Sequence, residues 1–295
     1  MYRLIVILTI IAFYLTGCGS PATDSGTTAP VILTSTTFLA DIVRNIAGGR
    51  VEVDSLLPIG TDPHSYQPTP QDVAKITQST LLIINGADYE HFLEPLLENA
   101  GGERTIIEAS AGIGPREEAR GVDPHLWLDP NNVILYVENI REGLTHFDPD
   151  GAAVYQSNAD EYMRQLAELD AWIVVQVDQI PAEKRLLVTN HEALGYFAER
   201  YGFIVVGTVV ESFSSDASPS AKQMADLIDQ IKASGAPAIF LDAGDNTSLA
   251  QQIADETGVR VVTELHLESL TDGAPAATYL DMMKNNVMQI VNALK

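Results

Sequence analysis

Apolar and polar positions follow two alternating periods along the chain. Between residues 31 and 147, short apolar runs typical of buried strands alternate with segments whose apolar residues recur every three or four positions, as in amphipathic helices. The predicted strands are 31–36, 51–57, 81–85 and 104–109, and the predicted helices are 38–48, 71–78, 89–101 and 131–147. This order predicts a parallel sheet with helices on both faces.

The pattern changes after residue 147. Asp148 and Pro149 are suited to be the N-cap and the first residue of a helix, and no Gly or Pro interrupts the chain from Ala152 to Ile180. At 1.5 Å per residue this segment forms a helix about 45 Å long, which Pro181 ends. A compact α/β lobe rarely needs such a helix, whereas a helix that joins two lobes does.

The strand–helix alternation resumes after Pro181. The predicted strands are 185–190, 203–210, 238–243 and 259–265, and the predicted helices are 191–201, 219–234, 248–257 and 275–294. We therefore predict an α/β protein of two doubly wound lobes, 31–147 and 182–295, joined by a single long backbone helix within 148–181. One continuous doubly wound domain is the alternative, because the number of strands fits both.

The N-terminus predicts export and lipid attachment. Arg3 precedes an apolar run, Leu4–Leu15, that is shorter than the roughly 20 residues needed to span a bilayer and fits a signal-peptide core. The small residues before Cys18, the only cysteine, resemble a bacterial lipobox. This implies a signal peptide (1–17), lipid on Cys18 and a flexible tether (18–30). The alternative is a chance Cys beside an ordinary cleavage site. We expect the protein on the outer face of the cytoplasmic membrane, periplasmic if the cell has two membranes.

The charge of the chain excludes one class of partner. It has 40 acidic and 17 basic residues, a formal net charge of −23, and no basic run longer than two. Nucleic acid is therefore not expected as a partner, because phosphate binding needs clustered Lys and Arg.

The tripeptide Asp-Pro-His occurs twice, ending at His64 and at His125, in a chain with six histidines. Proline fixes its own φ and keeps the preceding Asp extended, so each His stands on a stiff loop. The Asp can orient that loop or accept a hydrogen bond from an imidazole N–H. The alternative is a plain turn with an incidental His.

Four side chains lie in loops next to predicted strand ends or helix starts, two in each lobe. They are His64, His125, His191 and Glu268. Open α/β sheets bind ligands beyond the carboxyl ends of their strands. Three imidazoles and a carboxylate suit Zn²⁺, and Mn²⁺ or Fe²⁺ accept them too. The sequence therefore predicts a metal site in the cleft between the lobes.

Five stretches together resemble a known family. They are PIGTDPHSYQPTPQD (58–72), DPHLWLDPNN (123–132), VTNHEALGYFAERYG (188–202), IFLDAGDN (239–246) and VVTELHLESL (261–270). The chain from about Val31 to Lys295 is similar to the zinc and manganese receptors of ABC importers, also called the adhesin or lipoprotein receptor antigen family. The resemblance implies a lipoprotein that captures a divalent metal and delivers it to a membrane permease with an ATPase subunit. We expect a monomer.

The resemblance also bears on the ligands and the metal. His64 and His125 fall at the N-lobe ligand positions, His191 where the family has His or Glu, and Glu268 where it usually has Asp. Glu211 could approach the site in place of Glu268. His at 191 favours zinc, the main expectation. The stretch 112–125 lacks the extra histidines of many zinc members, which favours the manganese or iron alternative.

Other functions fit the sequence less well. A zinc hydrolase needs an open metal position and a general base, but the H-E-x-x-H motif that His191 begins has Gly195 at its last position. A surface adhesin has no support such as a repeat array. We therefore expect a receptor rather than an enzyme, with the metal as cargo. Of the other histidines, we expect His91 and His146 at the surface.

Overall fold

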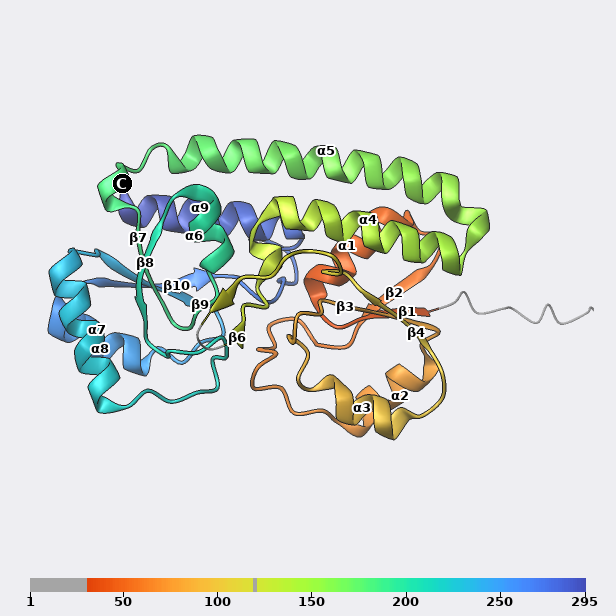
Figure 1. The fold of residues 1–295 in the computed structure, drawn as a ribbon, viewed down its shortest axis with the longest axis horizontal. Helices are drawn as coiled ribbons and strands as arrows, with labels where there is room; N and C mark the ends of the chain where they lie inside the picture. Colours follow the sequence, from red (N-terminus) through yellow and green to blue (C-terminus); the bar gives the residue numbers. More distant parts are fainter. Residues whose placement is uncertain (1–30, 119–120) are drawn as a thin grey trace, which may run out of the picture.

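A computed structural model describes residues 31–118 and 121–295. The predicted signal peptide, Cys18 and the tether lie outside the described residues. The described chain folds into two halves that lie side by side, with one long helix running along both (Figure 1). Within these residues, no helix combines the length and the apolar character needed to cross a membrane.

The first half contains a four-stranded parallel sheet in the order β2-β1-β3-β4. Its strands are β1 (Val31–Thr34), β2 (Glu52–Ser55), β3 (Leu81–Ile84) and β4 (Thr105–Glu108), and its helices are α1 (Thr37–Ala47), α2 (Pro70–Gln78), α3 (Leu93–Ala100) and α4 (Pro130–Phe147). Neighbouring residues of β1 face opposite cores: Ile32 packs in the core that includes α1 and α4, and Leu33 in the one that includes α2 and α3. Both faces of the sheet are therefore buried, as the unbroken apolar runs predict.

The second half repeats this design with a four-stranded parallel sheet in the order β10-β9-β7-β8. Its strands are β7 (Leu186–Thr189), β8 (Ile204–Thr208), β9 (Ala238–Asp242) and β10 (Arg260–Leu265), and its helices are α6 (Gly195–Tyr201), α7 (Ala221–Ser234), α8 (Ser248–Thr257) and α9 (Tyr279–Leu294). In chain order, the first and third strands are neighbours in both sheets. Such a switch point is where open α/β sheets bind ligands.

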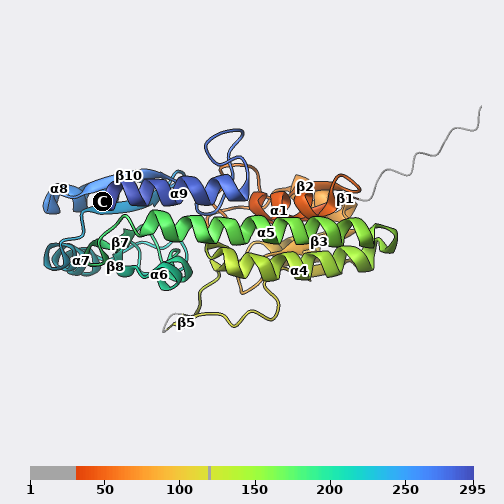
Figure 2. The same cartoon turned by 90° about the horizontal axis from the view of Figure 1, so that it is seen from above.

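The long helix α5 (Ala152–Val177) joins the halves. Its 26 residues span about 39 Å, and it packs on α1 and α4 of the first half and on α9 of the second (Figures 1 and 2). Its buried residues form one stripe at helical spacing: Tyr155, Ala159, Tyr162, Leu166, Leu169, Ile173 and Val177. The helix ends three residues before the predicted Ile180.

The interface between the halves is closely packed. A single apolar core includes residues of both sheets and of α1, α4, α5 and α9. Polar contacts cross it as well: the indole N–H of Trp127 donates to the carbonyl of Leu267 at 2.7 Å, and the hydroxyl of Tyr279 donates to the carbonyl of Trp127 at 2.6 Å. The predicted class of two α/β lobes joined by a long helix is confirmed, and the alternative of one continuous sheet is wrong for the described residues.

Several helices begin later than predicted. The helix predicted from His191 begins at Gly195; in the preceding loop the N–H of Glu192 donates to the carbonyl of Ser212 at 2.8 Å. The helix predicted from Tyr89 begins at Leu93 and follows a turn in which Ala87 and Asp88 take left-handed φ values of 52° and 59°. The closing helix begins at Tyr279 rather than at residue 275.

The remaining elements are short. They are the 3-10 helices η1 (Leu126–Leu128), η2 (Pro149–Gly151) and η3 (Ala182–Lys184), and the two-residue strands β5 (Glu117–Glu118) and β6 (Gly121–Val122), which pair antiparallel. Strands β5 and β6 were not expected from the sequence. They lie close to α6, at the junction of the two halves (Figure 1).

Candidate metal centre

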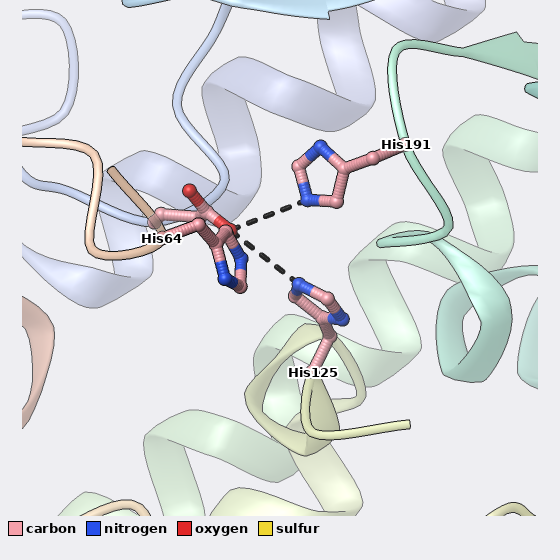
Figure 3. A group of neighbouring side chains, drawn as sticks. His64, His125 and His191 are labelled. Atoms are coloured by element: carbon pink, nitrogen blue, oxygen red, sulfur yellow. Dashed lines mark hydrogen bonds and ion pairs between the residues drawn. The ribbon is translucent and has the colours of Figure 1, made fainter. Parts of the chain in front are cut away.

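Four loops from both halves bring the predicted ligands to one place. His64 follows β2, His125 precedes η1, His191 follows β7, and Glu268 follows β10. Figure 3 shows the three imidazole rings pointing toward a common centre from three separate loops. One ligand atom from each of the four side chains lies within 4.8 Å of every other.

The loop of His64 is fixed by its own tripeptide. Asp62 Oδ1 accepts the backbone N–H of His64 at 2.9 Å, and Asp62 Oδ2 accepts the hydroxyls of Ser65 at 3.0 Å and of Ser215 at 2.7 Å. Ser215 belongs to the second half, so this contact ties the His64 loop to the opposite lobe. The His64 side chain is only 3% exposed.

The loop of His125 uses its aspartate for two contacts. Asp123 Oδ1 accepts the backbone N–H of His125 at 3.0 Å and lies 2.9 Å from the ring nitrogen Nδ1. Both residues are fully buried. A proton on Nδ1 leaves the lone pair of Nε2 directed at the centre, which is how a carboxylate prepares an imidazole to bind metal.

The second half supplies His191 and Glu268. Thr189 Oγ1 donates to the carbonyl of His191 at 2.7 Å, which holds the turn after β7. Next to Glu268, Ser269 Oγ accepts the N–H of Gly60 at 2.7 Å, which fixes the Glu268 loop against the first half. His191 and Glu268 are both buried.

The distances match a compact coordination sphere. Glu268 Oε1 lies 2.8 Å from His64 Nε2, 3.4 Å from His125 Nε2 and 3.3 Å from His191 Nε2. Ligand atoms at the corners of a tetrahedron with metal–ligand bonds of about 2.0–2.1 Å are about 3.3–3.4 Å apart. Two of the three contacts that Glu268 makes have this length, and all four ligand atoms lie within 4.8 Å of one another.

Charge at the centre favours a cation. Burial raises the pKa of Glu268, but attraction to His64 and contacts with all three imidazoles outweigh it and hold the pKa well below its usual 4.5. Burial lowers the pKa of His125, but the contacts with Asp123 and Glu268 prevail and raise it to about 9. A divalent ion that replaces the His125 proton would keep both carboxylates neutralised.

Aromatic rings pack against two of the four side chains, His64 and His125. Tyr89 meets the ring of His64 edge-on at 5.6 Å between centroids, and it packs at 4.8 Å on Trp127. Trp127 stacks on Phe38 at 4.6 Å. Trp127 therefore packs around the ligand loops. Tyr66 instead donates a hydrogen bond to Asp72 at 2.6 Å.

Glu211 and the three remaining histidines lie outside the group. Glu211 accepts a hydrogen bond from Gln223 Nε2 at 3.0 Å, so the converging carboxylate is that of Glu268. His266 is half-buried, with its backbone bonded to Asn286, and His91 and His146 are exposed.

Sequence reasoning missed the second-half residues that contact Asp123, chiefly Tyr196. Its hydroxyl donates to the carbonyl of Asp123 at 3.0 Å. No motif marks Tyr196, because its importance comes from a contact between segments more than 70 residues apart. The stretch VTNHEALGYFAERYG (188–202) nevertheless contains it.

Comparison with known proteins gives a consistent family. The family model described as zinc-uptake complex component A, periplasmic (ZnuA), matches residues 32–293. The manganese-binding lipoprotein MntA of Halalkalibacterium halodurans is 38% identical over 295 residues, which covers 98% of this chain and 97% of that protein.

Solved structures agree in fold. The periplasmic zinc-binding protein TroA of Treponema pallidum matches with a TM-score of 0.84 at 30% identity, over 90% of this chain and 99% of that one. A manganese-bound mutant of the periplasmic metal-binding protein of Candidatus Liberibacter asiaticus matches with a TM-score of 0.82 at 32% identity, over 90% and 100% of the two chains. Relatives of this chain thus include proteins named for zinc and for manganese.

Proposed function

Because this chain belongs to the ZnuA family of metal-binding receptors of ABC transporters, we propose that His64, His125, His191 and Glu268 together bind one divalent transition-metal ion, which is then delivered to a membrane permease. The convergence of four ligand atoms within 4.8 Å carries the proposal. The family consists of solute receptors, which favours a role in binding rather than catalysis.

Zinc is the ion that the donor set supports best. Three imidazole nitrogens and one carboxylate oxygen form a nitrogen-rich, four-coordinate set, and imidazole suits zinc well. All four side chains are at most 4% exposed, so the ion would be bound almost out of contact with water. This favours tight capture over an open catalytic position.

Manganese is the second candidate. A relative that is 38% identical over nearly its whole length is named for manganese. The chain also lacks additional histidines between residues 112 and 124. Affinity alone does not separate the two ions, because nearly any site of these ligands binds zinc more tightly than manganese. Growth of the cell on each metal is the more direct criterion.

Capture and delivery follow from the two-lobe design. Each half contributes two ligands, so a bound ion favours the arrangement in which the halves are docked. We propose that the closed, monomeric receptor then docks on a permease whose ATPase drives release. The proposed units are a first lobe (31–147), a linking segment (148–181) and a second lobe (182–295). Lipid on Cys18 would keep the receptor at the membrane outside the cytoplasm, where its relatives act.

Two experiments test the function. Metal analysis of protein purified without added metal should find about one zinc ion per chain, and a deletion strain should regain growth on limiting zinc only with the intact gene. Rescue on limiting manganese instead would favour the second candidate. A protein that binds neither ion would sink the proposal.

A further inference from the structure

A contact between the two halves converges on Asp123, the partner of His125. Arg116 and Asp123 lie on either side of the β5–β6 pair, and the N–H of Asp123 donates to the carbonyl of Arg116 at 3.0 Å. This part of the first half lies against α6 of the second (Figure 1). The contacts that α6 and Arg116 make with Asp123 therefore hold Asp123 in place.

Tyr196 of α6 bridges these two residues through its hydroxyl. The N–H of Arg116 donates to Tyr196 Oη at 2.9 Å, and the Tyr196 hydroxyl donates to the carbonyl of Asp123 at 3.0 Å. Tyr196 is only 7% exposed. The hydroxyl thus acts both as acceptor and as donor, and each bond crosses from one half of the molecule to the other.

The charged groups of Arg116 and Asp123 extend the same contact. The guanidinium of Arg116 lies 5.7 Å from the centroid of the Tyr196 ring and forms an ion pair with Glu199 of α6. Its Nε lies 3.8 Å from Asp123 Oδ2. Asp123 therefore has one carboxylate oxygen toward His125 and the other toward Arg116.

Gly195, the first residue of α6, allows the close approach. A Cβ at this position would lie 2.5 Å from Asp123 Oδ2 and 3.0 Å from Arg116 Nε. Both distances are shorter than ordinary carbon contacts, so only glycine lets the helix start against the carboxylate without displacement. The Gly that rules out the H-E-x-x-H motif thus has a positive structural role here.

We propose that Tyr196, Gly195 and Arg116 are positioning residues that hold Asp123, and through it His125, in the metal-binding orientation. This group, which we name the Tyr196 clamp, rests on the proposed function, because its effect is exerted on metal binding. His191 lies five residues before Tyr196, so the clamp ties the loops of two proposed ligands to one helix. His125 is then fully prepared only when the two halves are docked.

Tyr196→Phe tests the clamp, because it removes one hydroxyl and keeps the ring. Outer partners of metal ligands typically contribute 10- to 100-fold in affinity, so we expect the Kd for zinc, and likewise for manganese, to rise about tenfold. Chelator competition measures both values on the full chain, and circular dichroism verifies the fold. Gly195→Ala should weaken binding further, since the added carbon displaces the carboxylate itself.

Tyr201→Phe is the matched control. Tyr201 lies on the same helix, and its hydroxyl donates to Asp170 Oδ1 at 2.8 Å, on the linking helix and not to Asp123. It should lower Tm by an amount comparable with Tyr196→Phe but leave the Kd within about twofold. An equal loss of affinity in both variants would mean that Tyr196 acts only through general stability, and would overturn the clamp.

A double-mutant cycle with Asp123→Asn tests whether the effect passes through Asp123. In that background Tyr196→Phe should change the Kd by less than about twofold. Two fully additive losses, or a Tyr196→Phe protein that binds as the wild type does, would overturn the clamp while leaving the proposed function intact. A wild-type protein that binds neither ion would reject the function, and the clamp with it.

Discussion

The two Asp-Pro-His loops have the same tripeptide but use its aspartate differently. In both, the Asp accepts the N–H of the His two residues later, at 2.9 Å for Asp62 and 3.0 Å for Asp123. Only Asp123 also reaches the ring, 2.9 Å from His125 Nδ1. Asp62 instead turns its second oxygen toward the hydroxyls of Ser65 and Ser215.

Burial accounts for the difference. Asp123 is 1% exposed, so its charge needs partners from the protein, and the His125 ring and Arg116 provide them. Asp62 is only half-buried, so water can reach its carboxylate. The tripeptide thus fixes the backbone turn in both loops, whereas the tertiary environment decides whether the aspartate orients the imidazole.

The largest expected effect is the loss of either ring. His125→Ala or His64→Ala should weaken zinc binding by more than about 100-fold, above the range typical of outer partners of metal ligands, because each removes one of four proposed ligands. Chelator competition measures the affinity. His91→Ala, at an exposed histidine, should bind as the wild type does. Normal binding by His125→Ala would mean that the site is misassigned.

The aspartates should differ next. Asp123→Asn should weaken zinc binding by about 10- to 100-fold, because the amide no longer supports the His125 ring with a negative charge. Asp62→Asn should cost only a few-fold, since Asp62 has no contact with the His64 ring among its hydrogen bonds. Equal losses of zinc affinity in the two variants would mean that the contact of Asp123 with the His125 ring does not affect metal binding.

Stability against pH should separate the loops further. The pKa of His125 is raised to about 9 in the folded, metal-free protein, so its protonation stabilises the fold below about 6.5, and this contribution is lost as pH rises through 9. Burial raises the pKa of Glu90 to about 7. Ionisation of Glu90 therefore also lowers the stability of the fold as pH rises, but it does so mainly below pH 7.

Denaturant unfolding of the metal-free protein at pH 7 and pH 9 measures this effect. We expect the free energy of unfolding to fall over this interval in the wild type, and to fall less in Asp123→Asn, which removes a main cause of the raised pKa. Asp62→Asn should keep the wild-type slope. If the free energy of unfolding fell as steeply in Asp123→Asn as in the wild type, Asp123 would not be a main cause of the raised His125 pKa.

The smallest effect is expected at Ser215. Ser215→Ala removes the hydroxyl that donates to Asp62 across the interface of the halves, a contact half-exposed to water and worth about 1 kcal/mol or less. The zinc dissociation rate should rise by no more than about threefold, as stopped-flow chelation would measure. A tenfold rise in the dissociation rate would mean that Asp62 contributes as much to zinc binding as Asp123 does.

Much of the fold was predictable because its signals are local. Apolar runs and proline positions predicted the two parallel sheets and the linking helix, and the loops next to strand ends or helix starts contain all four converging side chains. Helix starts were less accurate: His191 lies ahead of α6, in a loop whose Glu192 N–H bonds to Ser212, a contact that no local pattern contains. The family resemblance is confirmed, whereas the metal and its ligands stay predictions.

The contacts around Asp123 were not predictable from one sequence. The pairing of Arg116 with Tyr196 depends on how two halves dock, and a lone Tyr or Gly in a helical segment carries no sign of it. The different contacts of Asp62 and Asp123 were not predictable for the same reason, since the tripeptides are identical and only their tertiary surroundings differ.

The continuous core beneath α5 has a consequence for unloading. Apolar side chains of both halves interlock there, so wide separation of the lobes would expose much of the hydrophobic interior to water, at a large free-energy cost. A permease that empties this receptor would therefore have to release the metal without separating the two lobes widely.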